Sequence, residues 1–168
     1  MSEPVIRTEG LVKEFPVASK TLGEPRKVLH AVTNVSLSVP KGGIFGIVGE
    51  SGCGKTTLGR TVLRLHEPTQ GRILYRGEPI YDYLPDEQGR YPAKIQKVNM
   101  MPYRRKMQII FQDPSASLDP RMTVGEIIGE ALDIHKLYGS KKERTDRIKE
   151  LLGMVGLNTE HANRYPHE

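Results

Sequence analysis

Hydrophobic and polar positions in the N-terminal part of the chain recur with the period of β-strands. Residues 5–15 predict one strand, and in residues 35–39 apolar residues alternate with serine, which is typical of a strand with one buried face. The polar residues 18–26 between them predict a loop. Residues 44–48 are apolar on both faces and precede glycines, which suits a strand buried within a parallel sheet. Residues 72–77 predict a further strand.

Helical periodicity begins directly after the glycines. From Lys55 to His66 the apolar residues fall on one side at helical spacing, and a proline and a glycine then end the run. Residues 78–99 are polar and rich in breakers, so they predict an exposed insertion. The apolar residues 107–112 predict a last strand.

The C-terminal third of the chain predicts helices. Each begins with a capping box, in which a hydroxyl and a glutamate three residues later satisfy free amides: Thr123 with Glu126, and Ser140 with Glu143. Apolar residues recur at helical spacing after both boxes, and Gly156 ends the second helix. The chain therefore moves from a β-rich part, through one strand–loop–helix unit, to a helical part.

Composition narrows the class of protein. The 168 residues fit one domain, and no apolar run approaches the roughly 20 residues that cross a bilayer. The N-terminus lacks the features of a secretory signal and the single cysteine cannot form an internal disulfide, so we expect a cytosolic protein. The net charge of +5 is compatible with nucleic acid, an anionic membrane or nucleotide phosphates, and does not choose among them.

A glycine-rich segment carries the clearest chemistry. Its residues are Gly49, Glu50, Ser51, Gly52, Cys53, Gly54, Lys55, Thr56 and Thr57, and they match the phosphate-binding loop G-x-x-x-x-G-K-[ST]. Glycines let successive amides point at phosphate oxygens, and the following helix adds its positive end. We expect Lys55 to reach the β and γ phosphates and Thr56 to ligate Mg²⁺. A chance glycine-rich turn is the alternative, but the strand and helix on either side favour a nucleoside triphosphate site.

The downstream segment 109–121, IIFQDPSASLDPR, narrows the class of triphosphatase. It closely resembles the Q-loop of ATP-binding-cassette (ABC) transporter ATPases. FQDP, then SLDPR, then TVGEII resembles the branch that serves oligopeptide, dipeptide and nickel importers, and RRKMQ at 104–108 and RYPHE at 164–168 agree. The resemblance covers essentially the whole chain. It implies an α/β fold, namely a truncated P-loop NTPase core of ABC type with an antiparallel β subdomain and a partial helical subdomain.

The same resemblance implies that residues 1–168 are the N-terminal part of one ABC ATPase domain. It implies a mostly β subdomain at 1–43, the P-loop strand and helix at 44–67, further strands, the insertion and the Q-loop strand at 68–114, and the start of the helical subdomain at 115–168. In the family, RYPHE is followed by the signature motif, the aspartate that supports magnesium and the catalytic glutamate, and none of these occurs here. We therefore assign no catalytic residue and expect negligible hydrolysis by this segment alone.

Two residues outside the loop gain roles from the resemblance. Gln112, a neutral amide that could contact Mg²⁺ or the attacking water, is implied to sense the nucleotide state for the helical region. A surface glutamine in a turn is its alternative. Phe15 occupies the place of the aromatic residue that stacks on adenine, and a core phenylalanine is its alternative. The expected cofactors are ATP and Mg²⁺, with Thr56 and Gln112 at the metal.

The resemblance also implies a biological role. The parent protein would be the ATP-binding subunit of an importer of oligopeptides, dipeptides or nickel, peripheral at the cytoplasmic face of the cell membrane. Its implied partners are transmembrane permease subunits, a second ABC ATPase subunit and, indirectly, an extracytoplasmic substrate-binding protein, with no nucleic acid. The alternatives are a nucleotide-binding fragment without catalysis and a non-transport ABC ATPase that acts on nucleic acid or ribosomes, suggested only by the charge.

Overall fold

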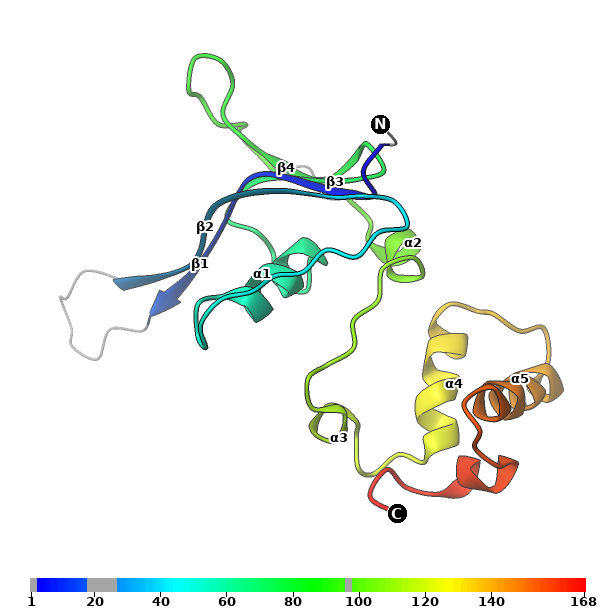
Figure 1. Ribbon diagram of the computed structural model, residues 1–168. Coiled ribbons are helices and arrows are strands. Elements are labelled where there is room, and N and C mark those ends of the chain that lie inside the picture. Colours follow the sequence, from blue (N-terminus) through cyan, green and yellow to red (C-terminus); the bar gives the residue numbers. More distant parts are fainter. Residues whose placement is uncertain (1–2, 18–26, 96–97) are drawn as a thin grey trace. The chain divides into compact units, whose positions relative to one another are not determined.

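The computed structural model describes residues 3–17, 27–95 and 98–168, so the predicted loop 18–26 lies outside the described residues. The chain forms two compact units, Met1–Met107 and Gln108–Glu168 (Figure 1). The elements in chain order are β1 Ile6–Val17, β2 Lys27–Val39, α1 Lys55–Val62, β3 Gln70–Tyr75, β4 Glu78–Tyr83, α2 Met101–Arg104, α3 Pro114–Ser117, α4 Val124–Ile134, α5 Lys141–Met154 and the 3-10 helix η1 Thr159–Asn163.

The strands of the first unit form a four-stranded antiparallel sheet in the order β2-β1-β3-β4. The pairing of β1 with β2 runs from Ile6 opposite Val39 to Val17 opposite Lys27, with three irregularities in register. Gly71 of β3 has a φ of +106°, and a Cβ at this position would lie 2.7 Å from the Cα of Leu11. Glycine is therefore required at this contact between β3 and the backbone of β1.

The core of the first unit lies between this sheet and α1, which covers one face of it (Figure 1). Alternate positions of β3 are buried, as the period of two requires. Leu58 is the buried apolar residue of α1, and it joins the cluster formed by the sheet. The buried members of this cluster are Leu11, Val32, Leu58, Ile73, Tyr75, Ile80, Tyr81 and Met107.

Residues 44–48 are not a strand in the structure, so that prediction is wrong. Ile44 and Val48 are almost completely exposed, and Phe45 and Ile47 are exposed too. A strand needs hydrogen bonds from a neighbour, and no described segment forms a ladder with these residues. The apolar pattern of a buried strand is present here without a partner strand.

The predicted strand 107–112 and the predicted insertion 78–99 also differ from the structure. Residues 107–112 form no strand, and only Met107 is buried, in the core of the first unit. The insertion begins with β4, whose Ile80 and Tyr81 are buried, so its first part is not exposed. Residues 84–95 are turns and loops at the surface, with Leu84 half-buried.

The second unit is helical, as the capping boxes predict. The Thr123 hydroxyl accepts from the Glu126 amide, and the Glu126 carboxylate accepts from the Thr123 amide at 2.7 Å, so the first box is complete. Only half of the second forms, because the Glu143 carboxylate accepts from the amide of Gly139. Helices α4 and α5 pack through Leu132, Ile148 and Leu152.

Arg144 of α5 ties the two long helices of this unit together. Its guanidinium donates to both carboxylate oxygens of Asp133 in α4, at 2.7 and 2.8 Å. These hydrogen bonds, with a further one from Tyr138, lower the pKa of Asp133 to about 2. None of the described helices is both long and apolar enough to cross a membrane.

Candidate functional site

The glycine-rich loop 49–57 follows residues 44–48, which form no regular element, and its last three residues, 55–57, form the first turn of α1. Gly52 and Gly54 have φ values of +81° and +97°, which favour glycine. A Cβ at Gly54 would also collide with the carbonyl oxygen of Ala31 in β2. The loop therefore turns into α1 in direct contact with the sheet, and glycine is what permits both the turn and the contact.

The start of α1 offers free backbone donors. Its first intrahelical bond runs from the Leu58 amide to the Gly54 carbonyl at 2.8 Å. The amides of residues 55–57 have no acceptor among the described residues, Gly54 supplies no side-chain cap, and the first turn contains no acidic residue. Amides at the positive end of a helix form an anion site, so this end of α1 fits a phosphate group.

Lys55 places a positive charge over the same loop. Its Nζ donates to the carbonyl oxygens of Gly49 and Glu50, at 2.8 and 2.6 Å, and lies 3.6 Å from the Sγ of Cys53. The amide of Cys53 donates to the Glu50 carbonyl at 3.3 Å and tightens the turn. The loop thus curls around the ammonium group, and amides and ammonium together match a polyanionic ligand.

The hydroxyl-bearing Thr56 follows at an exposed position on the first turn of α1. No group of three or more His, Cys, Asp or Glu side chains gathers within the described part of the chain. Hydroxyl oxygens, such as that of Thr56, are among the oxygen ligands that suit Mg²⁺.

Phe15 lies near the end of β1, half-buried and outside the core cluster. Its ring meets the ring of His66 edge to face, with centroids 5.4 Å apart, and the Nζ of Lys13 lies 4.6 Å from its centroid. These contacts do not support the alternative of a core phenylalanine. The stacking of Phe15 on adenine stays a prediction.

Gln112 is exposed and lies in a bend of the second unit. The next residue, Asp113, caps the short helix α3 by accepting from the Ala116 amide at 3.0 Å. The loop residues 49–57 lie together in the first unit, whereas Gln112 belongs to the second unit. Its role at magnesium stays a prediction.

Two arginines that the sequence does not single out as functional hold the other end of α1. Arg104 in α2 donates to the carbonyls of Leu63 and Arg64, at 2.6 and 2.9 Å. Arg64 is buried, pairs with Glu67 at 2.9 Å and donates to the Ile80 carbonyl at 2.7 Å. Contacts between an arginine and the carbonyls of a distant helix have no local sequence pattern, which is why these residues were missed.

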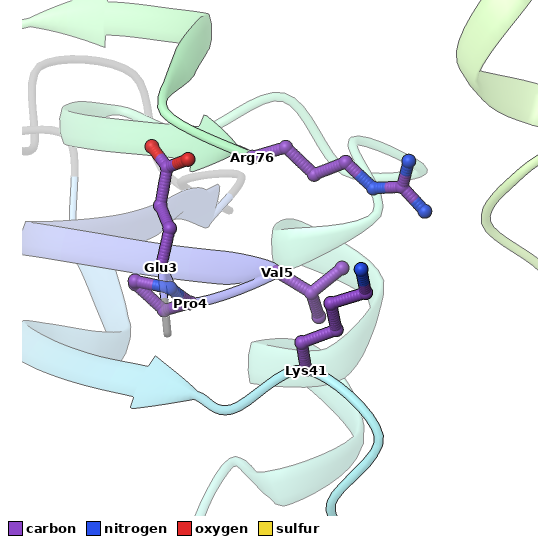
Figure 2. Close-up of a pocket in the computed structure, with 5 residues that line it drawn as sticks. All are labelled: Glu3, Pro4, Val5, Lys41 and Arg76. Carbon is purple, nitrogen blue, oxygen red and sulfur yellow. The ribbon is translucent and has the colours of Figure 1, made fainter. Parts of the chain in front are cut away.

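A separate pocket of about 240 Å³ opens beside the start of β1, lined by Glu3, Pro4, Val5, Lys41 and Arg76. Figure 2 shows the Lys41 side chain next to Val5, while the carboxylate of Glu3 points away from it. The guanidinium of Arg76 lies 5.4 Å from the ring centroid of Tyr75. None of the predicted nucleotide-site residues lines this pocket.

Unpaired amides at a helix start, beside a lysine that follows two glycines in left-handed conformation, characterise a phosphate-binding loop. The first unit therefore places the protein among nucleotide-binding proteins with such a loop. The family model for ABC transporters matches residues 32–168, and the chain belongs to this family.

Relatives with curated descriptions are consistent with this assignment. The chain is 54% identical over 168 residues to the oligopeptide transport ATP-binding protein OppF of Bacillus subtilis, covering 100% of this chain and 49% of the relative. It is 45% identical to OppF of Streptococcus mutans, with 83% and 42% covered. It is 43% identical to the glutathione import ATP-binding protein GsiA of Salmonella typhimurium, with 99% and 25% covered. The chain thus spans about half the length of the OppF proteins.

Solved structures show the same fold. The dimeric ATP-binding cassette MJ0796 bound to ADP and Pi matches with a TM-score of 0.65 and 25% identity, covering 96% of this chain and 62% of that one. A second dimeric structure of the MJ0796 cassette matches with a TM-score of 0.64 over the same shares. The described fold is therefore that of an ABC ATPase cassette, represented over part of its length.

Proposed function

We propose that this chain is the ATP-binding part of an ATPase that powers an oligopeptide importer. The observation that carries the proposal is the loop at α1, with its free amides and the Lys55 ammonium, in a chain 54% identical over its whole length to an oligopeptide transport ATP-binding protein. Glutathione, which the GsiA relative imports by name, is itself a small peptide, so both names agree on the class of cargo.

Within the proposed site each residue has a separate task. The amides at the start of α1 bind phosphate oxygens, and Lys55 donates to the β and γ phosphates. Phe15 offers a ring face to adenine, and the Thr56 hydroxyl and the Gln112 amide oxygen hold magnesium. Bound Mg²⁺ would neutralise charge on the triphosphate. This chain's own groups thus fix the nucleotide in place, and we assign no catalytic residue among them.

The proposed assembly follows from the same relatives. An importer ATPase has to transmit its nucleotide state to membrane-spanning permeases, and the cassette MJ0796 is dimeric. We therefore propose permease subunits and a second ATPase subunit as partners at the cytoplasmic face of the membrane. An extracytoplasmic binding protein would deliver the peptide. Nucleic acid is not part of this proposal.

Nucleotide binding by Lys55→Ala, with Lys41→Ala as a control of equal charge change, tests the proposal. Lys41 is exposed in a turn and lies outside the loop. Loss of charge-assisted hydrogen bonds to phosphate should weaken binding of a fluorescent ATP analogue by about tenfold or more in Lys55→Ala. Lys41→Ala should bind as the parent does.

Transport by the full-length protein, assembled with its permeases in proteoliposomes, tests the cargo. ATP-dependent uptake of an oligopeptide should occur, and Lys55→Ala should abolish it. Absence of nucleotide binding at millimolar ATP, or equal binding by the Lys55→Ala variant, would refute the proposed site. Uptake of another cargo without any peptide uptake would refute the importer assignment.

A further inference from the structure

Helix α1 is held by the rest of the first unit at both ends. At its start, Gly54 lies against the Ala31 carbonyl of β2. At its end, the guanidinium of Arg104 donates to the carbonyls of Leu63 and Arg64, at 2.6 and 2.9 Å. Leu63 is the C-cap of α1 and Arg64 is the residue after it. The C-terminus of a helix carries the negative end of the dipole, so a forked cation at these two carbonyls is a strong cap. The phosphate-loop helix is therefore tied directly to α2.

Helix α2 is also the last regular element before the second unit begins. The ring of Tyr103 meets the ring of Tyr75 edge to face, with centroids 5.7 Å apart. Met107, whose amide donates to the Tyr103 carbonyl at 2.9 Å, is buried in the core, and the second unit begins at Gln108. Gln112 follows a few residues later without a regular element in between. The backbone thus leads directly from α2, through the buried Met107, to the segment that carries Gln112.

We propose that Arg104 is a positioning residue that couples the phosphate-loop helix to the segment 108–112. This inference rests on the proposed nucleotide site. When a nucleotide displaces or stiffens α1, the two hydrogen bonds from Arg104 carry that change to α2 and on to the residues that lead to Gln112. Arginine suits this task because its planar guanidinium holds two carbonyls at once and so fixes a direction as well as a distance.

The neighbouring Arg105 provides a matched control. It is exposed, and its side chain makes no hydrogen bond or ion pair among the described residues. Replacement of either arginine by glutamine removes one positive charge from the same short segment. The two variants differ in whether the cap of α1 is lost.

Hydrogen exchange measured by mass spectrometry on the full-length protein, with and without a non-hydrolysable ATP analogue and magnesium, tests the coupling. In the parent, nucleotide should slow exchange in both peptides, the one that covers 49–57 and the one that covers 101–112. In Arg104→Gln the slowing at 49–57 and the nucleotide affinity should stay within about twofold of the parent. The slowing at 101–112 should fall by about tenfold, as expected for the loss of charge-assisted hydrogen bonds. Arg105→Gln should match the parent at both peptides.

Other outcomes separate this inference from the proposed function. Full nucleotide-dependent slowing at 101–112 in Arg104→Gln overturns the coupling, as does loss at both peptides together with a lower melting temperature, which indicates a merely structural role. If Arg104→Gln does not fold, Arg104→Lys decides, because it can keep one bond: intermediate slowing supports the coupling, and full slowing overturns it. If nucleotide slows hydrogen exchange only at 49–57 in the unsubstituted protein, only the coupling is refuted. If nucleotide slows hydrogen exchange at neither peptide in the unsubstituted protein, the proposed nucleotide site is refuted as well.

Discussion

Strand β3 and residues 44–48 are both short segments with isoleucine among their residues, yet one is buried in the core and the other is exposed. In β3, Ile73 is fully buried and paired with β1 and β4. In residues 44–48, Ile44 is fully exposed and no described strand pairs with it. Residues 44–48 are the more apolar of the two segments, since β3 also contains Gln70 and Arg72, so hydrophobicity does not decide which segment is buried. The comparison shows that an apolar segment is buried only where a neighbouring strand pairs with it and a helix covers it.

The largest expected difference between the two segments is in their isoleucines. Ile73→Ala should lower the free energy of unfolding of the 168-residue chain by about 2 to 5 kcal/mol, because it empties a core position. Ile44→Ala should change it by less than about 0.5 kcal/mol, as at other exposed positions. Urea unfolding followed by circular dichroism measures both. A large cost for Ile44→Ala would show that residues 44–48 are buried in solution and would break the comparison.

The glycines of the two segments sharpen the comparison at the level of the backbone. Gly71 has a φ of +106° and lies against β1, whereas a Cβ at Gly46 would meet nothing within 4 Å. Gly71→Ala should therefore cost about 1 to 3 kcal/mol of unfolding free energy through backbone strain. Gly46→Ala should be neutral within about 0.5 kcal/mol. The same urea titration applies, and equal costs for the two variants would contradict the described packing of β3 on β1.

The smallest expected effect on stability concerns a charged pair, Asp133 and Arg144, rather than an apolar residue and its partner strand. Asp133 has its partner in Arg144, and its pKa is lowered from 3.8 to about 2. Because the folded pKa lies below the unfolded value, the pair stabilises the second unit fully above about pH 4, and this contribution is lost as the pH falls toward 2. The carboxylate is exposed, so the change should be small.

Thermal melting between pH 2 and pH 6, compared between the parent and Asp133→Asn, measures this contribution. The parent should lose more stability than the variant between pH 4 and pH 2, since only the parent carries the titrating carboxylate. Parallel pH profiles would show that the Asp133–Arg144 pair does not form in solution.

Features with a local cause were predictable from the sequence. The capping box at Thr123 depends on two residues three positions apart, and it forms as predicted. The predicted strand 72–77 corresponds to β3, and the helix expected from Lys55 corresponds to α1, although α1 ends at Val62. The glycine loop was recognisable because its backbone needs particular residues at fixed spacing.

Features that depend on distant partners were not predictable. The buried Ile80 and Tyr81 of β4 are followed by a polar, proline-containing run, so the segment reads as exposed until β3 is known to lie beside it. The prediction for residues 44–48 was wrong in the opposite direction, since a buried strand was expected and the residues are exposed. The residue pattern of a segment does not show whether another strand is available to pair with it. Arg104 could not be found from the sequence either, since its acceptors lie about 40 positions away.

The two hydrogen bonds of the Lys55 ammonium have a consequence for the conformational entropy that the loop loses when a ligand binds. They link the Nζ of Lys55, the first residue of α1, to the carbonyl oxygens of Gly49 and Glu50 and so close the glycine-rich segment into a small ring. A flexible glycine segment would lose much backbone entropy on binding, but a ring that is already closed has less freedom left to lose. The lysine therefore serves the loop as an internal brace as well as a counter-charge.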